Sequence, residues 1–259
     1  MHIPKKPTSL DLMPNPFDWI IIPAGKVTLT YTGGYLTQDT TFDVPAFKMA
    51  KYPTTNAQFD VFINHPDGYK DSQWWDFSED AQKWRAENTQ PEPKIFDGDA
   101  HPRIGVCWYE AVAFCQWLSA ITGEKIMLPT EQQWQWAAQG DDGREYPWGN
   151  EWGISRCNHS VNNSVGIIGR GDSKLTTPVT QYEGVGDSPF GVVDMAGNVW
   201  EWCSTDWIGG GDDLSGINAR MLRGGEGIAR DVKELRVQYR IRYFPHGRGE
   251  RLGFRIARL

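Results

Sequence analysis

The sequence is most constrained between Asp194 and Trp202, where two tryptophans, an asparagine and two carboxylates fall within nine residues. Two large rings so close in sequence bury much apolar area, and each buried indole N–H then needs a hydrogen-bond acceptor. The carboxylate and amide oxygens can accept those hydrogen bonds or ligate a hard cation. Gly197 gives the backbone a freedom that residues with a Cβ lack. We therefore expect the rest of the chain to be organised around this stretch.

Helix-start signals stand on both sides of a long apolar segment. Thr55 with Gln58 and Thr130 with Gln133 each match a capping box. Between them, apolar side chains recur at the spacing of a helical face, and Gly123 suits a left-handed cap at the end. The predicted face of this middle helix consists of Trp108, Ala111, Val112, Cys115 and Leu118.

The strand signals are concentrated near the N-terminus. Residues 17–22 are rich in β-formers and end at a proline, which predicts a buried strand, and residues 27–31 are predicted to pair with it as a hairpin. Residues 1–16 hold four prolines and indicate an extended lead-in. Residues 65–100 are polar with scattered tryptophans, and we interpret them as a partly ordered surface insertion.

Charge and length exclude several classes of function. The net charge of -7 over 259 residues argues against a sequence-independent grip on nucleic acid. No apolar run approaches the roughly 20 residues of a membrane helix, and the N-terminus lacks the apolar core of a signal peptide. We expect a cytoplasmic protein, with display on a phage or cell surface by another route left open. No cysteine pair shows Cys-x-x-Cys spacing, so we expect reduced thiols at Cys107, Cys115, Cys157 and Cys203.

The order of motifs resembles a known family. Residues 197–202, Gly-Asn-Val-Trp-Glu-Trp, are similar to the signature of the formylglycine-generating-enzyme (sulfatase-modifying factor) superfamily. The resemblance implies an α+β protein with an elaborated C-type-lectin fold, in which few helices surround short antiparallel strands, and a single domain over residues 17–259. Five further segments agree in order: residues 52–59, 101–111, 128–134 with 146–150, 222–225 and 253–255.

The family's enzyme activity is not expected here. Its enzymes oxidise a substrate cysteine with two active-site cysteines that bind copper(I), one of them close to the Gly-Phe-Arg motif. In this chain Ile256 follows that motif, and no cysteine occurs after Cys203. Because a soft ion requires thiolate ligands, we expect neither formylglycine generation nor copper, and we identify no catalytic residue. The five histidines also lack the spacing of an iron site like that of the family's sulfoxide-forming relatives.

The resemblance also implies a structural calcium ion. By motif position, its ligands are the side chains of Asp194 and Glu201 and the backbone carbonyls of Gly197 and Val199. Hard oxygens with two formal negative charges suit Ca²⁺. The alternative is that both carboxylates accept hydrogen bonds from the backbone or from arginine.

Residues 235–243 alternate between arginine or glutamine and apolar side chains. Alone, this pattern predicts an apolar face in the core and solvated arginines. The resemblance implies the reverse, because the matching arginines of the family belong to the scaffold. We therefore expect Arg236, Arg240 and Arg242 to be buried or paired. The side chains expected to be exposed are Val237, Tyr239, Ile241, Tyr243 and Phe244.

The C-terminal region, residues 223–256, resembles the variable proteins of diversity-generating retroelements. In such proteins, mutated adenines replace asparagine codons while scaffold residues persist, and the resemblance implies a non-catalytic surface for an unknown protein or other macromolecular ligand. Tyrosine and phenylalanine suit such a surface because they give contact area at low entropic cost. The candidate ligand-binding residues are Gly227, Ile228, Ala229, Val237, Tyr239, Ile241, Tyr243, Phe244, His246, Gly247, Gly249 and Arg251.

Three alternatives remain open from the sequence. The C-terminal residues can reflect ordinary drift in a formylglycine-type domain. The chain can be an oxidoreductase with unrecognised chemistry, which requires a redox metal or a reactive thiol. It can also be an accessory domain that docks a partner through residues 65–100, where Trp74, Trp75, Phe77 and Trp84 cluster.

Overall fold

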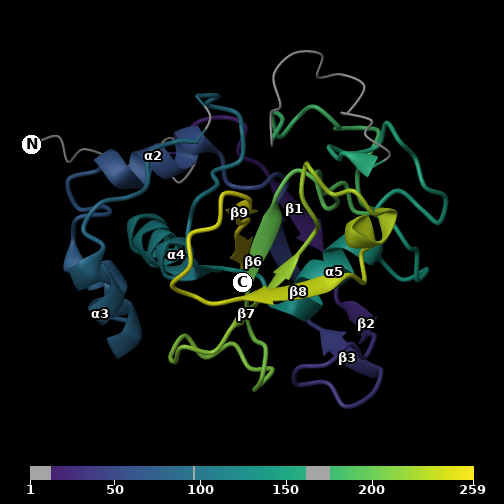
Figure 1. Cartoon of the computed structure of the whole chain (residues 1–259), viewed down its shortest axis with the longest axis horizontal. Helices are drawn as coiled ribbons and strands as arrows, with labels where there is room; N and C mark the ends of the chain where they lie inside the picture. Colours follow the sequence, from purple (N-terminus) through teal and green to yellow (C-terminus); the bar gives the residue numbers. More distant parts are fainter. Residues whose placement is uncertain (1–12, 96, 162–175) are drawn as a thin grey trace, which may run out of the picture.

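The computed structural model describes residues 13–95, 97–161 and 176–259, which form short helices and strands joined by long loops (Figure 1). The helices are α2 (Asn56–Asn64), α3 (Glu79–Glu87), α4 (Trp108–Thr122) and α5 (Glu131–Gln139), with 3-10 turns η1 (Ser72–Trp75) and η3 (Val232–Leu235). The strands are β1 (Trp19–Ile22), β2 (Gly25–Leu29), β3 (Thr40–Val44), β4 (Phe47–Ala50), β5 (Ile126–Met127), β6 (Trp200–Asp206), β7 (Arg220–Arg223), β8 (Arg240–Tyr243), β9 (Leu252–Gly253) and β10 (Ala257–Arg258).

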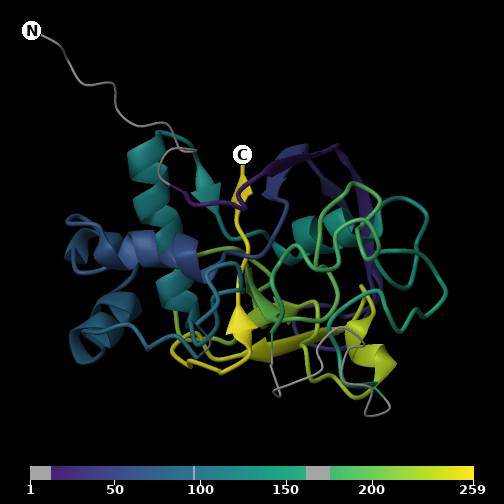
Figure 2. The same cartoon turned by 90° about the horizontal axis from the view of Figure 1, so that it is seen from above.

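The strands form three small sheets. Their orders are β1-β4-β10-β5, β2-β3 and β8-β7-β6-β9, and every pairing is antiparallel except that of β6 with β9. Strand β10, close to the C-terminus, lies between β4 and β5, so the last residues close a sheet begun by the first strands (Figure 2). The last sheet carries most of the C-terminal region at its β8 edge.

The predicted hairpin between residues 17–22 and 27–31 is wrong. Strand β1 pairs with β4, with Ile20 opposite Met49, and β2 pairs with β3, with Val27 opposite Phe42. A two-residue hairpin turn needs positive φ, which no residue between the two strands adopts. Pro23 instead directs the chain away, and its carbonyl accepts a 2.8 Å hydrogen bond from Trp136 Nε1.

The helix boundaries follow the caps in the sequence. Thr55 N–H donates to Gln58 Oε1 at 2.9 Å, and Thr130 N–H donates to Gln133 Oε1 at the same distance, so both predicted capping boxes are confirmed. Gly123 ends α4 with φ 74°, in the left-handed region that glycine tolerates. Sequence periodicity with these caps therefore locates the helices that carry the core.

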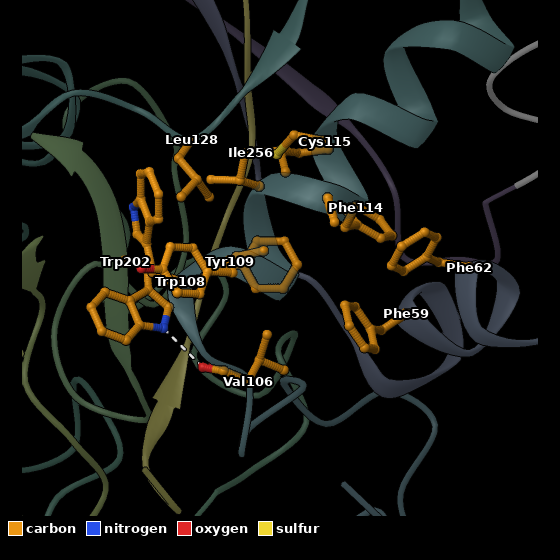
Figure 3. Packing of buried hydrophobic residues seen from close by; sticks show 14 of the residues in the cluster. Phe59, Phe62, Val106, Trp108, Tyr109, Phe114, Cys115, Leu128, Trp202 and Ile256 are labelled. Carbon is orange, nitrogen blue, oxygen red and sulfur yellow. Dashed lines mark hydrogen bonds between the residues drawn. The ribbon is translucent and has the colours of Figure 1, made fainter. Parts of the chain in front are cut away.

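The main core lies where α2 and α4 meet β6 (Figure 3). Phe59 of α2 stacks on Phe114 of α4 with ring centroids 5.7 Å apart. Trp202 Nε1 donates to Val106 O and Trp108 Nε1 to Cys203 O, each at 2.9 Å. Both buried indoles thus have the acceptors that their N–H groups require.

Residues 65–100 are more than a surface insertion. Tyr69, Trp75 and Trp84 are buried in the main core, and the two indole rings stack 5.7 Å apart. Their polar neighbours hide this contribution in the sequence, because η1 and α3 are short and expose most of their other side chains. Phe96 lies outside the described residues.

The end of the predicted lead-in is also anchored. Residues 1–12 lie outside the described residues, but Met13 is buried and Gln58 Nε2 donates to the Pro14 carbonyl at 3.1 Å. Within the described part of the chain, no helix is both long and apolar enough to span a bilayer.

Candidate functional site

Two buried arginines fix the C-terminal sheet to α5 through one carboxylate. Arg223 of β7 and Arg240 of β8 both contact Glu131, with nitrogen–oxygen distances of 3.2 and 2.8 Å, and all three side chains are buried. Tyr35 donates a further 2.9 Å hydrogen bond to Glu131 Oε2. A buried carboxylate between two guanidiniums offsets much of the desolvation cost of these charges. The expectation that Arg240 belongs to the scaffold is confirmed.

The neighbouring arginines lie nearer the solvent. Arg236 pairs with Glu145 at 3.2 Å and is half-exposed. Arg242 is exposed, and its guanidinium lies 4.4 Å from the centroid of the Trp207 ring. Among the described residues, Arg242 forms no salt bridge with a carboxylate, so the expectation that it is buried or paired is wrong. Arg242 lies nearer the solvent because Trp207 is at the edge of the buried face. The centroid of the same Trp207 ring is 5.2 Å from the Arg240 guanidinium.

Aromatic side chains of β8 and its flanks face the solvent. The exposed fractions are 37% for Tyr239, 45% for Tyr243 and 58% for Phe244, and Ile241 is half-buried. Phe244 stacks on His246, which is also exposed, with ring centroids 5.7 Å apart and planes at 22°. These large rings are exposed to solvent beside β8, whose Arg240 is paired with Glu131 of α5. They form a rigid apolar face.

Three of the candidate ligand-binding residues do not reach this face. Val237 is fully buried because alternation does not extend before β8: its N–H donates to Glu145 O at 2.8 Å, and its carbonyl accepts from Arg223 Nη2 at 2.7 Å. Ala229 is buried in a separate small cluster. Gly227 is buried where its N–H donates to Asn198 O at 3.0 Å. Ile228 lies beside them and is half-buried.

Four of the remaining candidates line an open depression of about 330 Å³. Tyr243, Ile241, Gly249 and Arg251 line it together with scaffold residues. Arg251 Nη1 lies 3.2 Å from Glu226 Oε1 at its edge. The lining residues that sequence reasoning missed are Trp200, Leu222, Glu226, Glu250 and Leu252.

Trp200 is missed because its motif reads as core. Strand β6 is buried along nearly its whole length, so its two tryptophans give no alternating signal. The Trp200 ring nevertheless packs at 6.0 Å from Tyr239. Glu226, which follows Arg-Gly-Gly in the sequence, lines the same depression.

Gly247 allows the loop that follows β8 to pack against Tyr243. A Cβ at this position would lie 2.4 Å from the Tyr243 ring, so only glycine lets that ring lie against the loop backbone. Residues 244–249, the rim loop, therefore support the exposed tyrosine from behind. Gly247 acts through its missing side chain rather than by offering one to a ligand.

The predicted calcium ligands fit an ion only in part. Glu201 accepts hydrogen bonds from Arg255 at 2.6 and 2.7 Å and from Trp134 Nε1 at 2.7 Å, so both of its oxygens already serve this chain. For Glu201, this arrangement matches the alternative to calcium, in which the carboxylate accepts hydrogen bonds from arginine. Asp194 differs, because no described residue forms a hydrogen bond with its buried Oδ1, and burial raises its pKa to about 7. Gly197 O accepts from Val199 N–H at 2.8 Å. The four residues are thus not a complete calcium site in this arrangement.

The four thiols are all buried. Desolvation raises the pKa of Cys107, Cys115, Cys157 and Cys203. A raised pKa keeps the thiol protonated, and the thiolate is the nucleophilic and metal-binding form. Among the described residues, no group of three or more histidine, cysteine or acidic side chains is placed to hold a metal ion.

Sequence comparison identifies relatives of several kinds. The model of the sulfatase-modifying factor enzyme 1-like domain matches residues 10–259. The formylglycine-generating enzyme of Streptomyces coelicolor is 34% identical over 205 residues, which cover 71% of this chain and 60% of the relative. Hercynine oxygenase of Mycobacterium tuberculosis is 30% identical over 243 residues (83% and 53%), and inactive C-alpha-formylglycine-generating enzyme 2 of Bos taurus is 31% identical over 194 residues (71% and 58%). The chain spans less than two thirds of the length of these relatives.

Comparison of structures gives the fold. Treponema denticola variable protein 1 superposes with a TM-score of 0.66 at 20% identity, covering 93% of this chain and 95% of that chain. PvdO of Pseudomonas aeruginosa gives a TM-score of 0.66 at 19% identity, covering 93% of each chain. The predicted α+β, C-type-lectin-like architecture is confirmed.

Proposed function

The chain belongs to the sulfatase-modifying factor enzyme 1-like domain family, and from that premise we propose that it is a non-catalytic member that binds a protein or other macromolecular ligand. The binding surface is the aromatic face, which we define as Tyr239, Ile241, Tyr243, Phe244, His246 and Arg251. The observation that carries the proposal is the exposure of Tyr243 and Phe244 on a strand held to the core by buried charges. Exposed aromatic patches on a rigid frame are typical of interaction sites.

The chemistry of the aromatic face suits a macromolecular partner. Its depression is open and is lined by Trp200 and Tyr243, so an apolar side chain of a partner can contact aromatic rings there. The Arg251–Glu226 pair at its edge offers one cation and one anion at the rim, where polar contacts select among partners. Because Arg240 is locked, binding orders few side chains and costs little conformational entropy.

The family contains precedents for the non-catalytic part of the proposal. One relative is named an inactive formylglycine-generating enzyme, and one structural neighbour of the same fold is named a variable protein. The burial of all four thiols supports binding over oxidative thiol chemistry. Oxidoreductase relatives share only part of their length with this chain.

Peptide selection tests the proposal without knowledge of the natural ligand. A phage-displayed library of disulfide-constrained peptides is panned on the wild-type protein with no counter-selection. We expect most enriched peptides to lose at least about tenfold in affinity, or about 1.4 kcal/mol, on the variant Tyr243→Ser/Phe244→Ser. The matched control, Ile208→Ser/Ile217→Ser, removes two apolar side chains elsewhere that are more exposed, at 65% and 64%. Peptides that bind the first variant as tightly as the wild type would contradict the proposal.

A further inference from the structure

Arg248 of the rim loop forms hydrogen bonds with residues that are distant in sequence. The Arg248 guanidinium contacts both oxygens of Glu110, with Nε 3.0 Å from Oε2 and Nη2 2.7 Å from Oε1. Its Nη1 lies 3.0 Å from Glu92 Oε1, and its Nη2 also donates to the Gln90 carbonyl at 3.0 Å. The hydroxyl of Tyr69 completes the set at 3.1 Å. One side chain of the rim loop thus joins α4 to residues 69–92.

The backbone of the rim loop is held as well. Trp84 Nε1 donates to the His246 carbonyl at 3.1 Å, and Trp108 N–H donates to the Pro245 carbonyl at 3.1 Å. The Arg248 guanidinium lies 4.8 Å from the Trp84 ring centroid, so one indole contacts the loop through both its N–H and its face. The loop therefore has fixed points on both sides of Gly247.

The acceptor at the centre of this contact is itself constrained. Glu110 is 1% exposed, caps α4 by accepting from Cys107 N–H at 3.0 Å, and accepts from the Tyr69 hydroxyl at 2.8 Å. A bidentate guanidinium–carboxylate pair fixes orientation as well as distance. The direction of Arg248 is set by the helix N-terminus, and with it the path of the rim loop.

We propose that residues 69–92 act as a buttress that holds the rim loop in one conformation, with Arg248 and Trp84 as positioning residues of the aromatic face. This inference rests on the proposed function, because a fixed loop matters to binding only where Phe244 and His246 contact a ligand. It also gives the tryptophans of residues 65–100 a role different from partner docking. Trp75 and Trp84 point into the core, and the buttress reaches the ligand side only through the loop it supports.

Hydrogen exchange of the full chain, followed by mass spectrometry, tests the buttress directly. Trp84→Phe keeps an aromatic ring in the core, removes the indole donor to His246 O and shortens the ring that packs on Trp75 and Arg248. We expect amides of residues 243–251 to exchange at least about tenfold faster in Trp84→Phe and in Arg248→Gln, while those of β6 keep wild-type rates. Arg242→Gln is the matched control, because that exposed arginine of the same region has no contact with the buttress. Unchanged exchange in residues 243–251 in both variants, whatever their melting temperatures, would overturn the inference.

A binding measurement separates this inference from the proposed function. The probe is a constrained peptide selected on the wild type whose affinity depends on Tyr243 and Phe244. We expect Trp84→Phe to raise its dissociation rate about tenfold and to leave its association rate within about threefold, since preorganisation is expressed mainly in dissociation. An unchanged dissociation rate in a variant with faster loop exchange would overturn the positioning role. If no selected peptide depended on Tyr243 and Phe244, the proposed function would instead be rejected. The hydrogen-exchange measurement would still test whether residues 69–92 hold the rim loop.

Discussion

At the scale of single residues, Asp194 is a buried carboxyl group that is only partly hydrogen-bonded. Its Oδ2 accepts from Asn198 Nδ2 at 2.8 Å, and its Oδ1 has no hydrogen-bond partner within residues 13–95, 97–161 and 176–259. Desolvation raises its pKa to about 7, against about 3.9 for an unperturbed aspartate. Because the folded pKa is the higher one, the folded state binds more protons between these values. The stability from this group is present below about pH 4 and is lost as pH rises to about 7.

This sign gives a prediction for Asp194→Asn. In a chelator, the unfolding free energy of the wild type relative to the variant should fall by up to about 1.4 kcal/mol per pH unit between about pH 4 and about pH 7. Asparagine tolerates the left-handed backbone at this position, where φ is 56°. Urea titrations of both proteins across this range provide the measurement. A difference that does not change with pH would show that Asp194 titrates near its ordinary value.

Calcium supplies a second prediction at the same residue. The resemblance implies a calcium ion here, which would require Glu201 to exchange its bonds to Arg255 and Trp134 for the ion; if that exchange occurs, about 1 mM calcium at pH 8 should raise the melting temperature of the wild type. Asp194→Asn should give no such rise, and magnesium serves as the ionic-strength control. Melting curves that are identical with and without calcium would leave the Arg255–Glu201 pair as the charge pair of this segment and reject the ion.

At the scale of elements, one glutamate connects a helix to a sheet. Glu131 stands in the first turn of α5 and holds Arg223 of β7 and Arg240 of β8. Glu131→Gln would keep the shape and remove the charge, leaving two buried guanidiniums without their countercharge. Breaking a buried pair in this way costs about 3–5 kcal/mol.

The prediction for Glu131→Gln is therefore a loss of that size in unfolding free energy. Chemical denaturation monitored by tryptophan fluorescence gives the value. Glu124→Gln is the matched control, because that carboxylate pairs with Arg258 at 2.7 Å where both side chains are partly exposed, and it should cost below about 1 kcal/mol. Equal losses in the two variants would show that α5 is not held to the sheet by this charge.

The secondary-structure elements also differ in how well the sequence predicts them. Helices α2, α4 and α5 follow from local signals, since Thr55, Thr130 and Gly123 act within one turn of their own positions, whereas α3 was not predicted. The partner of β1 does not, because β4 is chosen by a sheet that also needs β10 from the other end of the chain. Alternation likewise fails at Val237, where the backbone is bonded to Glu145 and Arg223 rather than to a strand.

The candidate site divides in the same way. Resemblance to a family located the exposed residues Tyr239, Tyr243 and Phe244, because a scaffold position can be read from motif order. It did not locate Trp200, which becomes part of the depression only through packing on Tyr239. Nor did it locate Arg248, because its partners, Glu110 of α4 and residues 69–92, are distant in sequence.

At the scale of the whole molecule, the C-terminal region lies between a buried frame and an exposed face. The frame consists of residues whose side chains are buried, and the aromatic face consists of residues whose side chains are partly or largely exposed. Amino-acid substitutions should therefore cost little stability on the aromatic face and much more in the frame, since substitutions of buried charges and packed apolar groups are the destabilising ones. The buried frame side chains of this region include Arg223, Ala229, Leu235, Val237, Arg240, Leu252, Phe254, Arg255 and Ile256.

This division predicts how the gene varies in a population. If the region is diversified, deep sequencing of its 3′ end should find amino-acid changes concentrated at the aromatic face and absent from Arg240 and Arg255. Val237 and Ala229 were expected to vary with the face, but their burial now predicts only small apolar residues there. The internal control is residues 126–139, where substitutions should be no more frequent than in the rest of the gene. Variation spread evenly over frame and face would contradict a diversified surface, because selection for folding would then have to tolerate the loss of the Glu131 and Glu201 charge pairs.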